Sequence, residues 1–295
     1  MTTKSPSDMK SIETLTQDVE NLFNGHNPDP EKLKRFGEAV ANTVANRVRT
    51  SGDGRQGYLR LSNIGKPARQ VFYDIQGYGP GAKYTPEKLA ASDKLKFLYG
   101  DLIEELFLYL AEEAGHDVSD RQKRVEVDGV VGHLDAKIDG VVVDVKSASK
   151  FSFGKFANGD ILNGHDPFGY VLQVSGYAKA ENADAAIWAI EKERATQALV
   201  RVPVEDPSPK ISVLRDALSR TTPPARCYEP VAVGKSGNKG LPVGCVFCSH
   251  KRECWSDANR GRGLRVFSYS TGPTYLVEVF ETPKVNEITN YFWKD

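Results

Sequence analysis

The chain has 295 residues with 39 basic and 39 acidic side chains, so its formal net charge is zero. Its apolar fraction of 40% and charged fraction of 26% are typical of a globular protein that folds in water. A net charge of zero excludes a strongly basic nucleic-acid coat protein, although a local basic patch could still bind nucleic acid. There is no apolar run of about 18 residues, and the polar first residues lack a signal-peptide core, so we expect a cytoplasmic protein without a membrane span.

Four segments are expected along the chain. Residues 1–55 predict a helical N-terminal extension with a long helix from Pro30 to Thr50. Residues 56–222 predict a core of helix, strands and helices, residues 223–260 a four-cysteine metal module, and residues 261–295 a C-terminal β-hairpin. Strands followed by helices in this order predict an α/β (α+β) fold, with a mixed sheet flanked by helices.

A glutamate interrupts the apolar side of the first core helix, which is predicted from Ser92 as N-cap to Gly115 as terminator. On a helical wheel Glu104 shares its side with apolar residues, while Glu105 points elsewhere. These neighbours of Glu104 are Phe97, Gly100, Leu108 and Ala111. A functional carboxylate is one explanation, and a solvated glutamate at the edge of the apolar stripe is the other.

Two Asp-Gly dipeptides between β-branched runs predict consecutive hairpins. They are Asp128-Gly129 and Asp139-Gly140. The pattern therefore predicts three antiparallel strands, Arg121–Val127, Val130–Ile138 and Val141–Lys146.

The register of the second hairpin brings two carboxylates together. If Asp139-Gly140 forms a two-residue turn, Asp135 lies opposite Asp144 and His133 lies opposite Lys146. Lys146 points the same way as Asp144 because side chains alternate along a strand. Opposed like charges destabilise a sheet, so we expect the carboxylates to share Mg²⁺ or Mn²⁺. The alternative, an exposed face with scattered charges, is disfavoured because the valines between them need cover on both faces.

Basic and aromatic residues interleave after this strand, from Lys146 to Phe156. Proteins that bind single strands use such residues for phosphate contacts and base stacking. We therefore predict DNA contacts at Ser147, Lys150 and Lys155, and a second contact at Lys66 and Arg69. The alternative for the first stretch is a solvated loop with phenylalanines in the core.

The helix predicted from Phe168 to Ala180 carries Gln173 and Tyr177 four residues apart, on one face. The pair could support the carboxylates or could be an ordinary surface pair.

All four cysteines fall near the C-terminus, with the spacing C-x17-C-x2-C-x5-C. They are Cys227, Cys245, Cys248 and Cys254. Thiolates at such spacing bind Zn²⁺ or an iron–sulfur cluster. Buried free cysteines or two disulfides are the alternatives, and disulfides are disfavoured in a reducing cytosol.

These motifs, in this order, resemble the PD-(D/E)xK nuclease superfamily. Asp135 with Asp144-Val145-Lys146 is similar to its hallmark, with Gly132-His133-Leu134-Asp135 in place of the "PD". Gly100-x3-Glu104, Gln173-x3-Tyr177 and the last three cysteines resemble the RecB-like branch, including the CRISPR-adaptation exonucleases and AddB-type subunits. The first cysteine of those families is absent from Ser62–Tyr73, so Cys227 is expected to replace it. The chain most resembles bacteriophage exonucleases of the podovirus type.

The resemblance implies a divalent-metal-dependent DNA exonuclease of phage recombination, replication or host DNA degradation. It implies that Glu104, Asp135, Asp144 and the Val145 carbonyl hold Mg²⁺ or Mn²⁺. Lys146 would orient or deprotonate the attacking water, and Gln173 and Tyr177 would support the site. The cysteines would hold a structural centre, with [4Fe-4S] preferred over Zn²⁺.

The expected partners are DNA, as linear or single-stranded ends, and a phage single-strand-binding or annealing protein, in the host cytoplasm if the chain is phage-encoded. Three alternatives remain open at this point. They are an endonuclease on the same site, a non-catalytic DNA-binding recombination accessory protein, and a redox- or zinc-regulated binding module.

Overall fold

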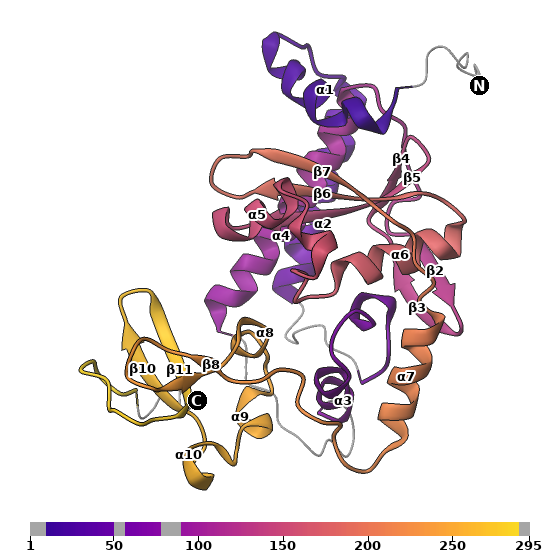
Figure 1. Cartoon of the computed structure of the whole chain (residues 1–295). Coiled ribbons are helices and arrows are strands. Elements are labelled where there is room, and N and C mark those ends of the chain that lie inside the picture. The colour runs from indigo at the N-terminus through magenta and orange to yellow at the C-terminus, as the bar shows by residue number, and fades with distance from the viewer. Residues whose placement is uncertain (1–9, 50–56, 78–89, 289–295) are drawn as a thin grey trace. The chain divides into compact units, whose positions relative to one another are not determined.

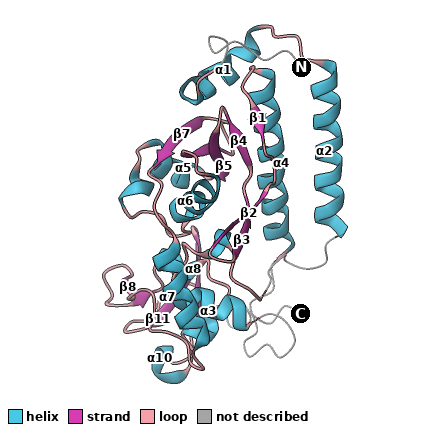
Figure 2. Cartoon of the chain, turned by 90° about the vertical axis from the view of Figure 1, so that its right-hand side faces the viewer, coloured by secondary structure: helices cyan, strands magenta, loops and turns pink. Residues whose placement is uncertain are grey.

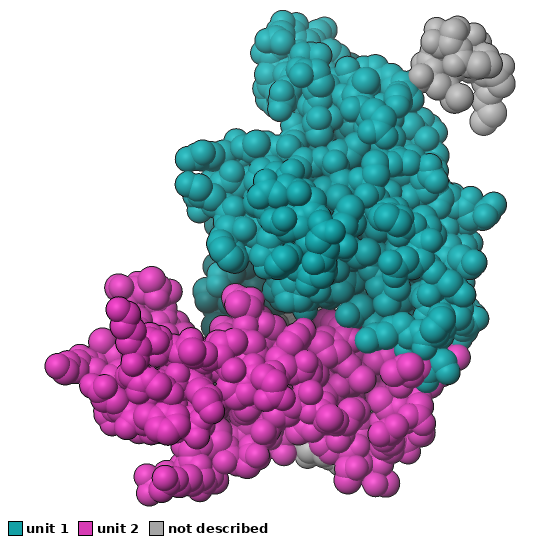
Figure 3. Space-filling model, viewed as in Figure 1, with its two compact units in different colours: residues 1–54, 59–65, 89–212 teal, residues 55–58, 66–88, 213–295 magenta. Residues whose placement is uncertain are grey.

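The computed structural model describes residues 10–49, 57–77 and 90–288. The chain divides into two compact units, which are described separately here (Figure 3). Unit 1 comprises residues 1–54, 59–65 and 89–212, and unit 2 comprises residues 55–58, 66–88 and 213–295. Within the described ranges, no helix is both long and apolar enough to cross a membrane. The boundary predicted between residues 55 and 56 lies outside the described residues.

Unit 1 is built on a five-stranded mixed sheet with the order β1-β4-β5-β6-β7 (Figure 1). Strands β5 and β6 are parallel, and the other neighbours are antiparallel. The strands are β1 (Val118–Ser119), β4 (Ala136–Ile138), β5 (Val141–Ala148), β6 (Ala185–Glu191) and β7 (Gln197–Val202). The helices α5 (Lys150–Ala157) and α6 (Tyr170–Glu181) lie in the connection between the parallel strands. The mixed sheet with its helices confirms the predicted fold class.

One face of this sheet packs on α4 (Ala91–Glu113) and α1 (Leu15–Asn21). Val141, Val143 and Val145 of β5 belong to this core together with Trp188, whose ring meets Phe107 edge-on at 5.3 Å. The other face also lies away from water, because Asp144 is fully buried. A strand covered on both faces has a nearly continuous apolar sequence, which explains the valine run of β5.

The helix α2 (Pro30–Arg49) is the long helix predicted from Pro30 to Thr50. It lies alongside α4 (Figure 2). The rings of Phe36 and Tyr109 stack with centroids 4.7 Å apart. Arg47, near the end of α2, donates to Asp101 in the middle of α4 at 2.7 Å, while Arg35, near the beginning of α2, donates to Glu112 near the end of α4 at 3.1 Å. The two helices are therefore antiparallel. The short 3₁₀ turns η2 (Ile12–Thr14) and η3 (Leu22–Asn24) flank α1.

The ends of α4 agree in part with the prediction. The helix ends before Gly115, which has a left-handed φ of +91° that favours glycine. It begins at Ala91 with Ala90 in the N-cap position, so the prediction of Ser92 as N-cap is wrong.

The predicted hairpin turns are confirmed, but the middle strand is not continuous. Asp139 and Gly140 have φ values of 50° and 82°, and Ile138 pairs with Val141 as expected. Before β4 in the chain, β2 (Arg124–Val127) and β3 (Val130–His133) form a separate two-stranded sheet, so the predicted strand Val130–Ile138 is divided into β3 and β4.

The prediction that His133 lies opposite Lys146 is therefore wrong, because His133 pairs with Arg124. The physical reason lies at Asp135, before β4 begins. Its Oδ2 accepts a hydrogen bond from the Val145 backbone N–H at 2.8 Å. At this position of β5 a side-chain carboxylate therefore takes the place of the backbone group of a neighbouring strand.

A second correction concerns the stretch after β5. The alternative of a solvated loop is wrong for most of it, because Lys150–Ala157 forms helix α5. Ser149 caps this helix, since its Oγ accepts from the Ser152 backbone N–H at 3.4 Å.

Unit 2 contains α3 (Ala68–Gln76) and a four-stranded sheet with the order β10-β11-β9-β8. The strands are β8 (Val231–Ala232), β9 (Lys239–Gly240), β10 (Arg265–Tyr269) and β11 (Gly272–Glu278), and the last two form the predicted C-terminal hairpin. Three four-residue helices lie between β9 and β10, namely α8 (Val243–Val246), α9 (Lys251–Cys254) and α10 (Ala258–Gly261). The remaining elements are η4 (Leu61–Asn63) and η5 (Asp160–Asn163) in unit 1, and α7 (Ser208–Ser219), which has residues in both units.

Candidate active site and cysteine cluster

Strand β5 presents Asp144 and Lys146 on the same face, as the alternation of side chains requires. The Lys146 Nζ lies 2.7 Å from Asp144 Oδ2. The other oxygen, Oδ1, accepts a hydrogen bond from Gln173 Nε2 of α6 at 3.0 Å. The Asp144 side chain is fully buried, whereas that of Lys146 retains 20% exposure. The lysine is thus held by a buried carboxylate but reaches solvent.

Asp135 lies where the chain passes from β3 to β4, and the residue as a whole is half-buried. Its bond to the Val145 N–H joins it to the centre of β5. Burial and the neighbouring charge of Asp144 raise the pKa of Asp135 to about 7. The predicted juxtaposition of these two aspartates is therefore present, although Asp135 reaches β5 from a bend and not from a ladder pair.

Glu104 projects from α4 toward the same carboxylates. Burial and the charge of Asp135 raise the pKa of Glu104 to about 8, and Asp144 contributes in the same direction. Gln122 Nε2 donates to Glu104 Oε1 at 2.9 Å. Glu105 points elsewhere and pairs with Arg121. The helical-wheel distinction between the two glutamates is therefore confirmed.

We name Glu104, Asp135 and Asp144, together with Lys146, the carboxylate site. It holds three carboxylates and one ammonium group. Burial also raises the pKa of Asp144, while the aspartates raise the pKa of Lys146 against the effect of its burial. Burial is the largest cause of the raised carboxylate pKa values, and the charges of neighbouring carboxylates add to it. Oxygen donors are the type that a hard divalent cation such as Mg²⁺ or Mn²⁺ prefers, although among the described residues these carboxylates are not arranged to hold one as they stand.

Gln173 and Tyr177 lie on the face of α6 toward this site, as their spacing predicts. Tyr177 is buried, and burial with the charges of Asp144 and Asp135 raises the pKa of its hydroxyl. A Cβ at Gly132 would lie 2.6 Å from Tyr177 Cε1 and 2.8 Å from Leu61 Cβ. The glycine three residues before Asp135 therefore makes room for the tyrosine ring, which links two motifs that are far apart in sequence.

Tyr170 is a residue of the site that sequence reasoning missed. Its ring centroid lies 5.1 Å from Lys146 Nζ, within cation–π range. It precedes Gln173 by three residues and Tyr177 by seven, so all three share one helical face. That spacing was the available signal. Asp166 caps this end of α6, accepting from the Val171 backbone N–H at 2.8 Å.

Five residues were predicted to contact DNA. Three of them, Ser147, Lys150 and Lys155, follow Lys146 of the carboxylate site closely in the chain. Ser147 lies against α4, since a Cβ at Gly100 would be 3.3 Å from its Oγ. Lys150 and Lys155 lie on α5. Lys66 belongs to unit 2, where its Nζ lies 3.3 Å from Asp74. Arg69 also belongs to unit 2 and lies among the cysteines.

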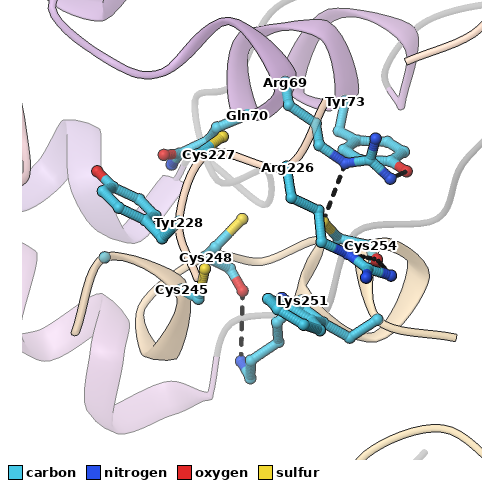
Figure 4. A pocket seen from close by; sticks show the side chains of 12 residues that line it. Arg69, Gln70, Tyr73, Arg226, Cys227, Tyr228, Cys245, Cys248, Lys251 and Cys254 are labelled. Carbon is cyan, nitrogen blue, oxygen red and sulfur yellow. Dashed lines mark hydrogen bonds between the residues drawn. The ribbon is translucent and has the colours of Figure 1, made fainter. Parts of the chain in front are cut away.

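The four cysteines line one pocket of unit 2, with side chains of α3 and the segment around Arg226 (Figure 4). We name them the cysteine cluster. All four are free thiols in the structure, so the disulfide alternative is not realised there. Burial raises the pKa of Cys245 to about 11 and that of Cys248 to about 12. Within the described ranges, no three His, Cys, Asp or Glu side chains are arranged to hold a metal ion.

Cationic groups surround the cysteine cluster. Arg69 Nε donates to Cys254 Sγ at 3.1 Å, and Arg69 also donates to Tyr73 Oη at 3.1 Å (Figure 4). Arg226 donates to the Cys254 carbonyl at 3.0 Å and lies 4.2 Å from the Trp255 ring centroid. Four thiolates around a divalent ion or an iron–sulfur core carry net negative charge, which these cations complement. The donor chemistry therefore fits a soft metal.

No family model matches the chain, and no curated protein sequence matches it. Among solved structures, SSO0001 superposes with a TM-score of 0.41 at 14% identity, covering 72% of this chain and 93% of that one. LHK-Exo, an alkaline exonuclease from Laribacter hongkongensis solved with dAMP, gives a TM-score of 0.39 at 12% identity, covering 56% and 89%. A phage-related exonuclease from Haemophilus somnus 129PT gives 0.32 at 16%, covering 55% and 90%. These TM-scores do not establish a shared fold, so the interpretation of the site depends on its own geometry.

Proposed function

We propose that the protein is a divalent-metal-dependent DNA exonuclease. The observation that carries this proposal is the carboxylate site, in which three carboxylates with raised pKa values share one lysine on a rigid strand. Such a site attracts a divalent cation and, with it, an anionic substrate such as a phosphodiester. The resemblance of its motifs to PD-(D/E)xK nucleases supports the same reaction.

Asp144, Asp135 and Glu104 would hold the cation, with the Val145 carbonyl as a further ligand. A bound divalent cation supplies Lewis-acid stabilisation of the phosphate and lowers the pKa of a bound water. Asp144 Oδ2 is paired with Lys146 in the structure, so Lys146 would turn from this oxygen toward the substrate. There its ammonium would hydrogen-bond the attacking water or neutralise charge that develops on the phosphate. Gln173 would keep Asp144 oriented through its bond to Oδ1.

Degradation of labelled DNA tests this proposal. Linear and closed circular DNA, single- and double-stranded, would be incubated with Mg²⁺, Mn²⁺ or a chelator. We expect metal-dependent loss of the linear forms alone, absent in Asp144→Asn and retained in Asp216→Asn, whose carboxylate is 66% exposed. Cleavage of circles would favour the endonuclease alternative. Absence of cleavage with every metal would contradict the proposal and favour a non-catalytic DNA-binding accessory protein.

The cysteine cluster is proposed to hold a structural metal centre, with [4Fe-4S] preferred over Zn²⁺. The spacing of the last three cysteines and the complementary charges of Arg69 and Arg226 support this assignment. The centre would join α8, α9 and the segment around Cys227, and metal binding there would contribute folding free energy. A brown protein with matching iron and sulfide content supports the cluster, and a colourless protein with one zinc per chain supports Zn²⁺. A metal-free folded protein would contradict both.

A setting in phage recombination, replication or host DNA degradation is proposed from the motif resemblance alone. A phage single-strand-binding or annealing protein is the corresponding partner. Co-purification of such a protein with the chain from infected cells would test this part, and its absence under conditions that retain nuclease activity would contradict it.

A further inference from the structure

Helix α5 directly follows the strand of the carboxylate site and exposes an aromatic ring. The Phe151 side chain is 77% exposed, a large apolar surface for a residue close to charged groups. Single exposed rings are common on protein surfaces, so the exposure of Phe151 gains significance only from the charged groups beside it. The opposite side of the helix is anchored, because Phe156 is buried. The exposure of Phe151 is therefore a property of a well-packed helix.

The charges of α5 complement an anionic partner. Its sequence, Lys150–Ala157, contains two lysines and no acidic residue. Lys155 Nζ lies 5.5 Å from the centroid of the Phe151 ring, so a cation and an aromatic face are presented together. We name Lys150, Phe151 and Lys155 the α5 surface.

Aromatic contacts connect the buried side of α5, opposite Phe151, to the carboxylate site. Phe156 of α5 stacks with Tyr170, with ring centroids 6.3 Å apart. Tyr170 in turn lies over Lys146, and Phe168 contacts Tyr170 at 5.5 Å. These contacts hold the buried side of α5 beside Tyr170 and Lys146, and the chain order places Lys150 four residues after Lys146.

We propose that the α5 surface binds single-stranded DNA, with an unpaired base stacked on Phe151 and phosphates contacted by Lys150 and Lys155. Stacking on a side chain requires a base whose face is free, which a single strand offers and the interior of a duplex does not. The proposal deepens the proposed nuclease function, on which it rests, by naming the strand form that enters the site.

Fluorescence anisotropy of labelled oligonucleotides with the full-length protein tests this inference. Added divalent metal is omitted, so binding is measured without cleavage. Loss of one base stack costs about 1–3 kcal/mol, so Phe151→Ala should weaken single-strand binding by roughly 5- to 150-fold. Phe151→Trp should retain binding, because it keeps an aromatic face. Phe23→Ala is the matched control, since Phe23 is 76% exposed on η3 at a distance in sequence from the site.

The lysines give an independent readout. Lys150→Gln and Lys155→Gln should each reduce the slope of log affinity against log salt by about 0.7. Lys34→Gln on α2 serves as their control.

Three outcomes would overturn the inference: unchanged single-strand affinity in Phe151→Ala, an equal loss for duplex, or no single-strand binding by the wild type. The nuclease proposal fails by a different result. In that case the protein still binds DNA through Phe151 but shows no metal-dependent cleavage.

Discussion

The carboxylate site and the cysteine cluster are built on different supports. Asp144 and Lys146 lie on an eight-residue strand inside a five-stranded sheet, whereas Cys245 and Cys254 lie in helices of four residues each. The first site offers oxygen donors, and the second offers sulfur. The hydrogen bonds of the sheet position the carboxylates whether or not a cation is bound. The short helices around the cysteines pack on a small apolar core that includes Trp255 and Tyr275, and we expect a metal there to contribute to folding and a metal at the carboxylates to catalysis.

The largest expected effect is on the folding of unit 2. Cys248→Ser should lose the metal and several kcal/mol of stability, since structural zinc sites contribute about 10–16 kcal/mol in small domains. Thermal unfolding and limited proteolysis should show early loss of residues 213–288, with unit 1 retained. Ser256→Ala, at an exposed position of the same module, should behave like wild type. Full stability of Cys248→Ser would remove the distinction between the two sites.

Asp144→Asn should have the opposite effect to Cys248→Ser, with a large loss of cleavage and little loss of stability. Cleavage should fall at least about 100-fold, the scale for loss of one preorganised electrostatic group in an active site. The midpoint of thermal unfolding should change little, because removal of one crowded carboxylate offsets the loss of its pair with Lys146. Aggregation of Asp144→Asn would mean that the buried aspartate is needed for folding.

Arg69→Gln tests the electrostatic account of the cysteine cluster. A hydrogen bond to a charged group contributes about 1.5–3 kcal/mol, so the variant should release its metal faster to a chelator. Its DNA affinity should be unchanged, in contrast to the original prediction of a DNA contact. Arg252→Gln, on the exposed side of α9, is the control. Normal metal retention with weakened DNA binding would restore the DNA-contact assignment.

Gly132→Ala tests the contact between β3 and α6. The added methyl group would overlap the Tyr177 ring, and overpacking of this kind costs about 1–3 kcal/mol. Gly154→Ala is the matched control, because nothing lies within 4 Å of a Cβ there and alanine favours the helix. Equal unfolding free energies for the two variants would show that the tyrosine ring can move aside.

The smallest effect concerns pH. Hydrogen bonds from Lys123 and Lys137 hold the pKa of Glu181 below its usual range. A lowered carboxylate pKa adds stability that is present above the unfolded-state value of about 4.3 and is lost as pH falls through the folded-state value. The contribution should be under about 1 kcal/mol, because Lys123 is exposed. Glu181→Gln should reduce the free energy of unfolding at pH 7 and leave it unchanged at pH 2.

Local patterns were sufficient to predict the central part of the carboxylate site. The Asp139-Gly140 turn determines the pairing of Ile138 with Val141, and alternation then places Asp144 beside Lys146. The helical wheel likewise separates Glu104 from Glu105. These predictions depend only on residues close together in the chain or on one helix.

The remaining features depend on contacts between distant segments. The break before β4 arises because the Asp135 side chain takes the place of a ladder partner, which the strand pattern does not contain. Arg69 lies 185 residues from Cys254 in the chain, so no spacing rule could bring them together. Helix α5 differs, because its composition of lysines and phenylalanines also suits a loop and only the N-cap at Ser149 indicates a helix start.

The central claim is that the carboxylates bind a hard divalent cation independently of the cysteine cluster. The most direct test is Mn²⁺ titration followed by electron paramagnetic resonance on wild type, Asp144→Asn and Arg69→Gln. We predict saturable Mn²⁺ binding by wild type and Arg69→Gln, and loss of that binding in Asp144→Asn. Undiminished Mn²⁺ binding by a folded Asp144→Asn protein would contradict the account.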